Sequence, residues 1–244
     1  MAEVNLENRL TSLEKKLASQ EKLIARQEKG IYDLNAIKEI NDLMSKYEYL
    51  HCSGMFPEHA ELFAKRDDTI AQVGDWGYYQ GWESIRKCYA GLHMYGGLDG
   101  PGYLYEHYLT TSLVVVAGDG KTAKGVWMSP GNETMPAHLV PGKKRELAPG
   151  EKQKGAPGWC NVKYGTDFIM MPDKHWYIWH NIVFLTFWAD YNNPDGWGVS
   201  GEHRGAHRDQ RVPKEFGPDK PSIPWHQPYS PDTKREFMPA FPLP

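Results

Sequence analysis

The chain has 244 residues, of which 40% are hydrophobic, and a formal net charge of −3. This length can supply one sizeable domain with extensions, and the near balance of charge gives no reason to expect a nucleic-acid or anionic-membrane partner. The three cysteines, Cys52, Cys88 and Cys160, show no CxxC spacing, which favours free thiols in a reducing compartment. With no apolar leader and no run of about 18 apolar residues, we expect a cytoplasmic protein.

Residues 1–35 are expected to form an N-terminal amphipathic helix. Its apolar side chains repeat every seven residues in two series, which are Leu10, Leu17, Ile24 and Ile31, and Leu6, Leu13 and Leu34, with Gln20 and Gln27 interrupting the second series. Such a heptad pattern is typical of a coiled coil. We therefore expect the helix to join subunits in a homo-oligomer, the alternative being a helix that lies on its own domain.

The next segments are helical first and then form a run of long strands. A second helical segment is expected over 37–64, broken near Ser53-Gly54 and restarted after Pro57, and another helix over 82–92. Long strands are expected over 105–117, 122–129, 159–170 and 176–188, with hairpin turns at 118–120 and 172–174. Helices followed by a run of antiparallel strands indicate an α+β fold, with helices covering one face of a strongly curved sheet.

Two polar segments interrupt or follow this core. Residues 130–158 are too long and polar for a hairpin turn and are expected to form a long loop insertion. From about residue 191 to 244, Pro, Gly and charged residues dominate, but aromatic side chains persist. We expect an extended Pro-rich tail that docks on the body of this or another subunit.

The order and spacing of several short motifs resemble the SnoaL-like branch of the nuclear transport factor 2-like superfamily over about residues 36–190. These motifs are Gly81-x-Glu83-x-Ile85, the strand that opens on His107, the Asp-Gly turn before "TAKG", and Trp176-x-Ile178-x-His180. The resemblance implies a cone-shaped curved antiparallel sheet wrapped around a long helix, with a deep pocket between them. Family members include scytalone dehydratase, a bile acid 7α-dehydratase, polyketide cyclases and cofactor-free lyases of lignin-derived diarylpropanes, and many others bind without catalysis.

The resemblance also suggests roles for single residues. His107 matches the histidine that acts as general acid and base in the dehydratases, and Tyr47 matches a tyrosine that hydrogen-bonds the substrate oxygen. Two positions depart from the dehydratase pattern, because Cys52 stands where an aspartate is common and Asn181 where an arginine is common. These departures imply either an active pocket with a different charge layout or a pocket without chemistry. The missing aspartate favours carbon–carbon cleavage or another nonstandard reaction over simple dehydration.

Elementary chemistry supports the same candidates. An imidazole titrates near neutrality, so His107 can accept and return a proton. His51 lies four residues after Tyr47, on the same helix face, where a phenol and an imidazole could bind a hydroxyl group. Lys124 shares a strand face with Val126 and Met128. If that face points inward, its ammonium could stabilise an oxyanion, and if it points outward Lys124 is a solvated lysine.

The remaining candidates are assigned to substrate binding. His180 either lines the pocket or packs beside Trp176, and Asn181 is a weaker candidate. The aromatic wall of the pocket is expected from Tyr78, Tyr105 and Trp127. No metal site is expected, since His203 and His207 lie in a Gly- and Arg-rich tail without a carboxylate cluster.

The sequence therefore predicts a lyase, dehydratase or isomerase that needs no cofactor and acts on a small hydroxylated, aromatic substrate by general acid–base chemistry. Deformylating cleavage of a diarylpropane-type diol is one form of this reaction. His107, Tyr47 and Lys124 are the predicted catalytic residues. The alternatives are a noncatalytic small-molecule-binding or assembly protein with the same fold, and a scaffold without a pocket.

Overall fold

The computed structural model describes residues 2–74, 76–95, 98–139, 145–194, 196–197, 213–223, 229, 231–232 and 234. The helices are α1 (Ala2–Cys52), α2 (Phe56–Ala60), α3 (Trp82–Arg86) and α4 (His93–Tyr95), with a π-helical stretch (Lys87–Leu92) between α3 and α4 and 3₁₀ turns at Ala137–Leu139 and Lys214–Phe216. The strands are β1 (Ile70–Val73), β2 (Tyr78–Gln80), β3 (Leu104–His107), β4 (Thr110–Val116), β5 (Thr122–Pro136), β6 (Gly155–Met170) and β7 (Trp176–Asp190).

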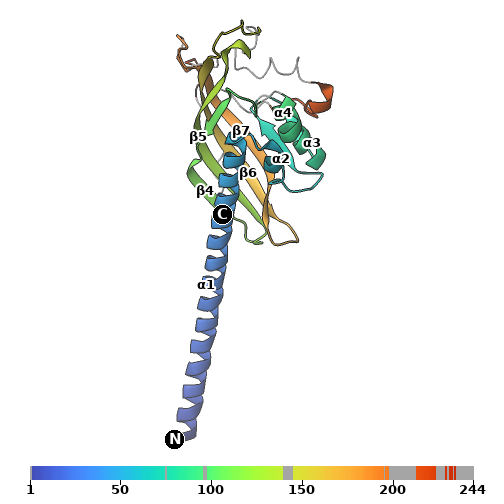
Figure 1. Ribbon diagram of the computed structural model, residues 1–244. Helices are drawn as coiled ribbons and strands as arrows, with labels where there is room; N and C mark the ends of the chain where they lie inside the picture. The colour runs from blue at the N-terminus through green and yellow to red at the C-terminus, as the bar shows by residue number, and fades with distance from the viewer. Residues whose placement is uncertain are drawn as a thin grey trace.

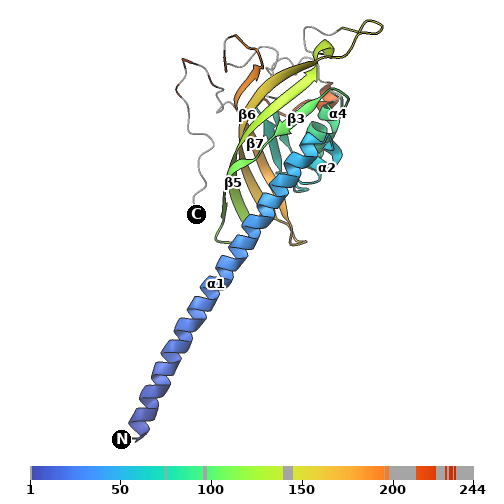
Figure 2. The ribbon, with the colours of Figure 1, turned by 60° about the vertical axis from the view of Figure 1, so that its left-hand side comes forward.

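The strands form one curved sheet in the order β2-β1-β7-β6-β5-β3, and β4 also pairs with β5. All pairs are antiparallel except β1 with β7, which is parallel. The end of α1 lies in the hollow of the sheet, and α2, α3 and α4 cover the same side (Figures 1 and 2). This arrangement confirms the predicted α+β fold with a curved sheet around a long helix.

Helix α1 is continuous, whereas two helical segments were expected. Nothing in the junction near residue 36 breaks a helix, because proline is absent there and Ala36 is itself a strong helix former. The second half of α1 buries Ala36, Ile40, Met44 and Tyr47 against the sheet, at the three- and four-residue spacing of one helix face. The helix ends at Cys52, and Gly54 follows with a φ of 70°, a left-handed conformation that favours glycine.

The first long strand is divided in two, which corrects the expectation of one strand over 105–117. His107 is the last residue of β3, not the first of a strand, and the register with β5 shifts between Thr110 and Leu113. Thr111, in the shift, has a φ of 52°. Both pieces still pair with β5, so the interruption bends the sheet edge around the end of α1 without breaking the sheet.

The loop expected over 130–158 is shorter, because β5 runs to Pro136 and β6 begins at Gly155. Pro130 within β5 does not end the strand. Its carbonyl accepts a hydrogen bond from the Tyr108 amide, so its missing N–H faces the gap between β3 and β4. Proline and glycine in "SPGNETMP" led to the prediction of a loop, although this segment belongs to β5 and carries Glu133.

Part of the C-terminal tail lies against the sheet edge at β2. Lys220 exchanges backbone hydrogen bonds with Tyr78, and the Asp219 carboxylate accepts hydrogen bonds from the Gln80 amide, the Ser84 hydroxyl and Lys87. The Ile223 amide donates to the side chain of Gln72. Among the described helices, none combines the length and apolar character needed to cross a membrane. Most of 224–244 lies outside the described residues.

Candidate functional site

An inner cavity of about 50 Å³ lies between the end of α1 and the sheet. Its lining combines aromatic and aliphatic side chains with a few polar ones, and it consists of Tyr47, His51, Val73, Gly74, Trp76, Tyr89, His93, His107, Glu133, Cys160, Val162, Tyr164, Val183, Leu185 and Trp188. Apolar walls with few converging polar groups are typical of small-molecule sites. Three of the predicted residues, Tyr47, His51 and His107, are brought together here.

The polar centre of this cavity is a histidine–carboxylate pair. The Nε2 of His107 lies 3.0 Å from Oε1 of Glu133, and both side chains are less than one-tenth exposed. In the neutral ring, the hydrogen bond to Glu133 places the proton on Nε2 and leaves the lone pair on Nδ1. Nδ1 is buried and has no hydrogen-bond partner among the described residues. The pair therefore has the form of an oriented general base.

Opposing effects act on the pKa of His107. Burial alone would lower it, but the hydrogen bond to Glu133 and the charges of Glu133 and Glu48 outweigh burial, so the pKa is raised above 6.5. The ring is thus protonated over a wider pH range than a free imidazole. In the β3–β5 register Glu133 pairs with Tyr105 and His107 pairs with Gly131, so His107 and Glu133 are diagonal neighbours held in place by the sheet.

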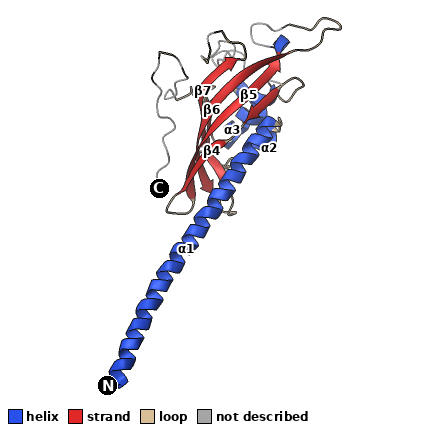
Figure 3. Ribbon diagram, turned by 90° about the vertical axis from the view of Figure 1, so that its left-hand side faces the viewer, coloured by secondary structure: helices blue, strands red, loops and turns tan. Residues whose placement is uncertain are grey.

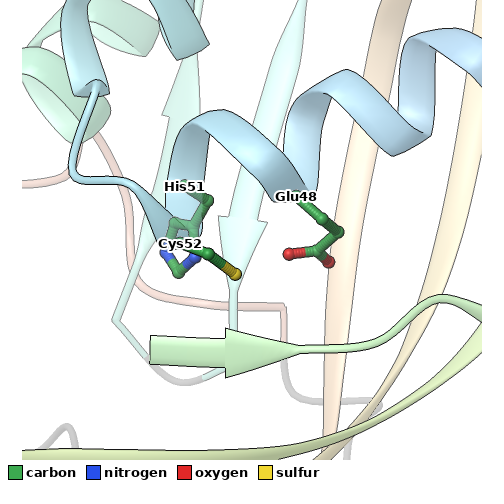
Figure 4. A group of neighbouring side chains, drawn as sticks. All are labelled: Glu48, His51 and Cys52. Carbon is green, nitrogen blue, oxygen red and sulfur yellow. The ribbon is translucent and has the colours of Figure 1, made fainter. Parts of the chain in front are cut away.

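Glu48 is a second buried carboxyl group close to His107. It lies on α1, only 5% exposed, and both its oxygens are without a hydrogen-bond partner in the part of the chain that the structure describes. Burial raises its pKa from 4.5 to about 7, and the neighbouring His107 and Tyr164 only partly offset this rise. In Figure 4 the carboxylate of Glu48 and the sulfur of Cys52 point toward each other from α1. Glu48 can therefore hold or release a proton near neutral pH.

A second, outer cleft of about 280 Å³ shares His107 with the inner cavity. It is lined by Ser45, Glu48, Tyr49, Cys52, Glu106, His107, Tyr108 and Leu109. Tyr49 and Tyr108 are 77% and 52% exposed, so two aromatic rings are available at its rim. His107 lines both spaces, with Glu133 on the inner side and Glu48 on the outer side.

His51 belongs to a group of four packed imidazoles. Its ring centroid lies 5.2 Å from that of His107, 5.6 Å from His59 and 5.8 Å from His93. Burial, followed by the charges of these three rings, lowers the pKa of His51 well below 6.5. His51 is consequently neutral at neutral pH and shapes the cavity as a polar aromatic ring.

Tyr47 takes part in a buried hydrogen-bond network. Its hydroxyl lies 3.0 Å from the hydroxyl of Tyr89 and accepts a hydrogen bond of 3.2 Å from the amide of Asn181. The Asn181 oxygen accepts in turn from the Thr166 hydroxyl at 2.9 Å. Burial, the main cause, raises the pKa of Tyr47 well above 10, so the phenol stays protonated. Asn181 does not line the cavity itself, but it holds Tyr47 in place.

Lys124 faces solvent, so the inward orientation considered for it is wrong. Its side chain is 68% exposed and lies 3.3 Å from Asp167. The buried face of this part of β5 belongs to Ala123, Gly125 and Trp127, because strand residues alternate between the two faces. Lys124 lines neither the inner cavity nor the outer cleft.

His180 also lies outside both spaces. The register between β6 and β7 pairs Asp167 with His180 and Phe168 with Ile178, so Trp179 is an extra residue in a β-bulge. The bulge turns His180 away from the face of Ile178, where it contacts Asp167 at 2.9 Å and the backbone oxygen of Asp68 at 3.2 Å. After the bulge it is Asn181 that points inward and is fully buried.

The three predicted wall residues line neither space. Tyr78 lies on β2 beneath Lys220 of the tail. Tyr105 packs with Phe56 in a small separate core cluster, and Trp127 packs in the main core, against Phe168. The aromatic lining comes instead from Trp76, Tyr89, Tyr164 and Trp188.

Among the residues that the structure describes, two groups place possible metal donors within 4.8 Å of one another. They are Glu48, His51 and Cys52, and His107, Glu133 and Cys160. Burial raises the pKa of Cys52 to about 11 and that of Cys160 well above 9. Both thiols are thus protonated at neutral pH, a form that binds metals weakly. His203 and His207 lie outside the described residues.

The sequence did not lead us to predict four residues of the site, which are Glu48, Glu133, His59 and His93. Glu48 is adjacent to Tyr47 and precedes His51 by three residues, a spacing that places Glu48 and His51 on one side of a helix. This spacing was visible in the sequence, but a glutamate there is equally typical of the solvent-exposed face of an amphipathic helix. No sequence pattern predicted Glu133 as a site residue, because the neighbouring proline and glycine made its segment look like a loop.

The fold and site define a small α+β domain in which a curved sheet and a helix enclose buried, interacting ionisable groups. A family model described as the SnoaL-like domain matches residues 33–181, more than half of the chain, and the protein belongs to this family. No curated protein matches the chain.

Several solved structures are similar in fold. The hexachlorocyclohexane dehydrochlorinase LinA-type3 from Novosphingobium barchaimii LL02 is 15% identical, with a TM-score of 0.47, 68% of this chain covered and 95% of that chain. A scytalone dehydratase candidate from Novosphingobium aromaticivorans DSM 12444 is 15% identical, with a TM-score of 0.47 and coverages of 69% and 95%. The Kfla4162 protein from Kribbella flavida is 12% identical, with a TM-score of 0.46 and coverages of 62% and 90%.

Proposed function

We propose that the protein is a cofactor-independent lyase that removes water or formaldehyde from a small hydroxylated aromatic compound by general acid–base catalysis. The observation that carries the proposal is the buried His107–Glu133 pair, with an unpaired Nδ1, at the wall between the inner cavity and the outer cleft. A base held by a carboxylate partner is suited to accept a proton.

The outer cleft is the proposed site for the aromatic ring of the substrate. Its volume of about 280 Å³ exceeds that of the inner cavity, at about 50 Å³, and Tyr49 and Tyr108 offer stacking faces at its rim. The ring would lie against these tyrosines while the hydroxylated carbon reaches His107. The inner cavity then has room for only a small polar group beyond His107.

In this mechanism Nδ1 of His107 takes a proton from the substrate, and Glu133 stabilises the imidazolium that forms. For loss of water, His107 takes the proton from a carbon atom, and the electron pair of that carbon–hydrogen bond forms the new double bond. Glu48 gives its proton to the departing hydroxide. For loss of formaldehyde, the proton comes from a hydroxyl group, the carbon–carbon bond breaks, and Glu48 protonates the carbon that receives the electron pair. Glu48, with a pKa of about 7, serves as an acid at neutral pH.

The test is turnover of a panel of hydroxylated aromatics, including diaryl 1,3-diols, in metal-free buffer without added cofactor. Alkene formation and formaldehyde release are measured separately. His107→Asn should reduce the turnover of the active compound by about 10²–10⁴-fold, the usual contribution of a positioned acid or base. Near-ultraviolet circular dichroism establishes that the variant is folded.

A matched control is available within the chain. His180 forms a histidine–carboxylate pair with Asp167 at 2.9 Å but lines neither space, so His180→Asn should keep its activity. Turnover that survives His107→Asn would remove His107 from the mechanism. Tight binding of a panel member without turnover would contradict the lyase proposal and support a noncatalytic small-molecule-binding protein.

A further inference from the structure

The N-terminal part of α1 extends away from the domain as an isolated rod (Figures 1 and 3). At about 1.5 Å per residue, residues 6–34 span roughly 40 Å. The apolar side chains in this segment are more than half exposed, and they are Leu6, Leu10, Leu13, Leu17, Leu23, Ile24, Ile31 and Leu34. Helices of this kind obtain most of their stability from packing an apolar face, so the rod lacks its partner.

All of these exposed side chains except Leu23 fall on two positions of one heptad repeat, in which Gln20 and Gln27 occupy two of the positions. In the usual lettering, position a holds Leu10, Leu17, Ile24 and Ile31, and position d holds Leu6, Leu13, Gln20, Gln27 and Leu34. A seam with a period of 3.5 residues fits another helix that crosses at a shallow angle, not a flat sheet or a membrane surface. The two glutamines can pair across the seam only if identical positions meet, which sets the register.

The charges beside the seam identify the partner and its direction. Position e holds Glu7, Glu14, Glu21 and Glu28, and position g holds Arg9, Lys16, Leu23 and Gly30, so the basic residues lie in the first two heptads. In a parallel pair of identical helices, each g side chain faces the e side chain of the next heptad, so Arg9 meets Glu14 of the partner subunit and Lys16 meets the partner's Glu21. An antiparallel pair would instead place e against e, glutamate against glutamate.

We propose that residues 6–34 form a parallel, in-register coiled coil with a second copy of this chain. The domains then lie at the same end of the coiled coil, beside one another. The rod leaves the domain near Tyr32, whose hydroxyl donates to the backbone oxygen of Gly120 in the β4–β5 turn. This contact fixes the direction of the rod relative to the sheet.

Disulfide formation in the full-length chain tests the direction. Leu10→Cys and Ile31→Cys, made separately, should each give a cross-linked pair under mild oxidation, because identical a positions face each other along the whole seam. Ala18→Cys, at an outward b position, is the matched control and should not cross-link beyond the background of the unmodified chain. If neither position cross-links, or only one does, the parallel in-register arrangement is refuted.

Light-scattering mass measurements test whether the seam causes the assembly. Leu17→Glu combined with Ile24→Glu should convert the oligomer to a monomer that keeps its near-ultraviolet circular dichroism. A monomeric unmodified chain at micromolar concentration, or an oligomer that survives the double substitution, would overturn the proposal.

Charge exchange gives an independent test of the pairing. Glu14→Lys with Glu21→Lys should raise the concentration for half-assembly about tenfold at low salt, from four repulsive contacts of a few tenths of a kcal/mol each. Adding Arg9→Glu and Lys16→Glu should restore it, because the four exchanged contacts are again between opposite charges. Failure of the fourfold variant to recover would show that these charges do not meet across the seam.

Discussion

Replacing Glu48 by glutamine should stabilise the protein at alkaline pH and impair its activity. Glu48 is buried and its oxygens have no hydrogen-bond partner among the described residues, so its ionised form is disfavoured in the folded state. The rise of its pKa from 4.5 to about 7 corresponds to about 3 kcal/mol, at about 1.36 kcal/mol per pKa unit. Glutamine has nearly the same shape but cannot ionise.

The protons bound at Glu48 determine how the free energy of unfolding changes with pH. Between pH 4.5 and about 7 the folded state binds more protons at Glu48 than the unfolded state. The free energy of unfolding therefore falls by about 3 kcal/mol as pH rises through that window, and this decrease is complete above about pH 8. Glu48→Gln should not show the loss, so its stability relative to the unmodified protein should increase by up to about 3 kcal/mol between pH 4.5 and pH 8.

Urea unfolding of both proteins at pH 4.5 and pH 8 measures this difference, and turnover of the active panel compound measures the catalytic effect. The comparison between the two proteins cancels other titrating groups to first order. Activity should fall about 10²–10⁴-fold if Glu48 is the acid. An equal stability difference at both pH values would refute the argument, because it would mean that Glu48 ionises normally in the folded state.

Three further results are expected. Glu133→Gln should extend turnover to lower pH, because the loss of the negative charge of Glu133 lowers the pKa of His107; an unchanged pH profile would show that Glu133 does not control this pKa. Lys124→Met should leave turnover within about twofold of the unmodified rate, since Lys124 is 68% exposed and lines neither space; a larger loss would place it in the mechanism. Chelators should leave turnover unchanged, because both thiols near the site are protonated at neutral pH, a form that binds metals weakly; a loss of turnover on chelation would place a metal in the mechanism.

Local patterns in the sequence determined several features of this protein. The heptad series of residues 6–34 and the amphipathic face that buries Ile40, Met44 and Tyr47 both follow from side-chain periodicity, which a single helix expresses directly. The hairpin between β4 and β5 and the α+β class followed from turn residues and from the order of the elements. His107 was assigned to the cavity mainly through resemblance to a family, whereas His51 followed from its four-residue spacing after Tyr47 on one helix face.

The tertiary structure decided which side chains meet. Glu133 reaches His107 because β3 pairs with the far end of β5, 26 residues away in the sequence, in a segment whose proline and glycine suggested a loop. The bulge at Trp179 decided that Asn181, and not His180, points inward, since one extra residue reverses the faces of a strand. The pKa values of Glu48 and His107 depend on burial and on charges brought together from separate elements, so no local pattern could predict them.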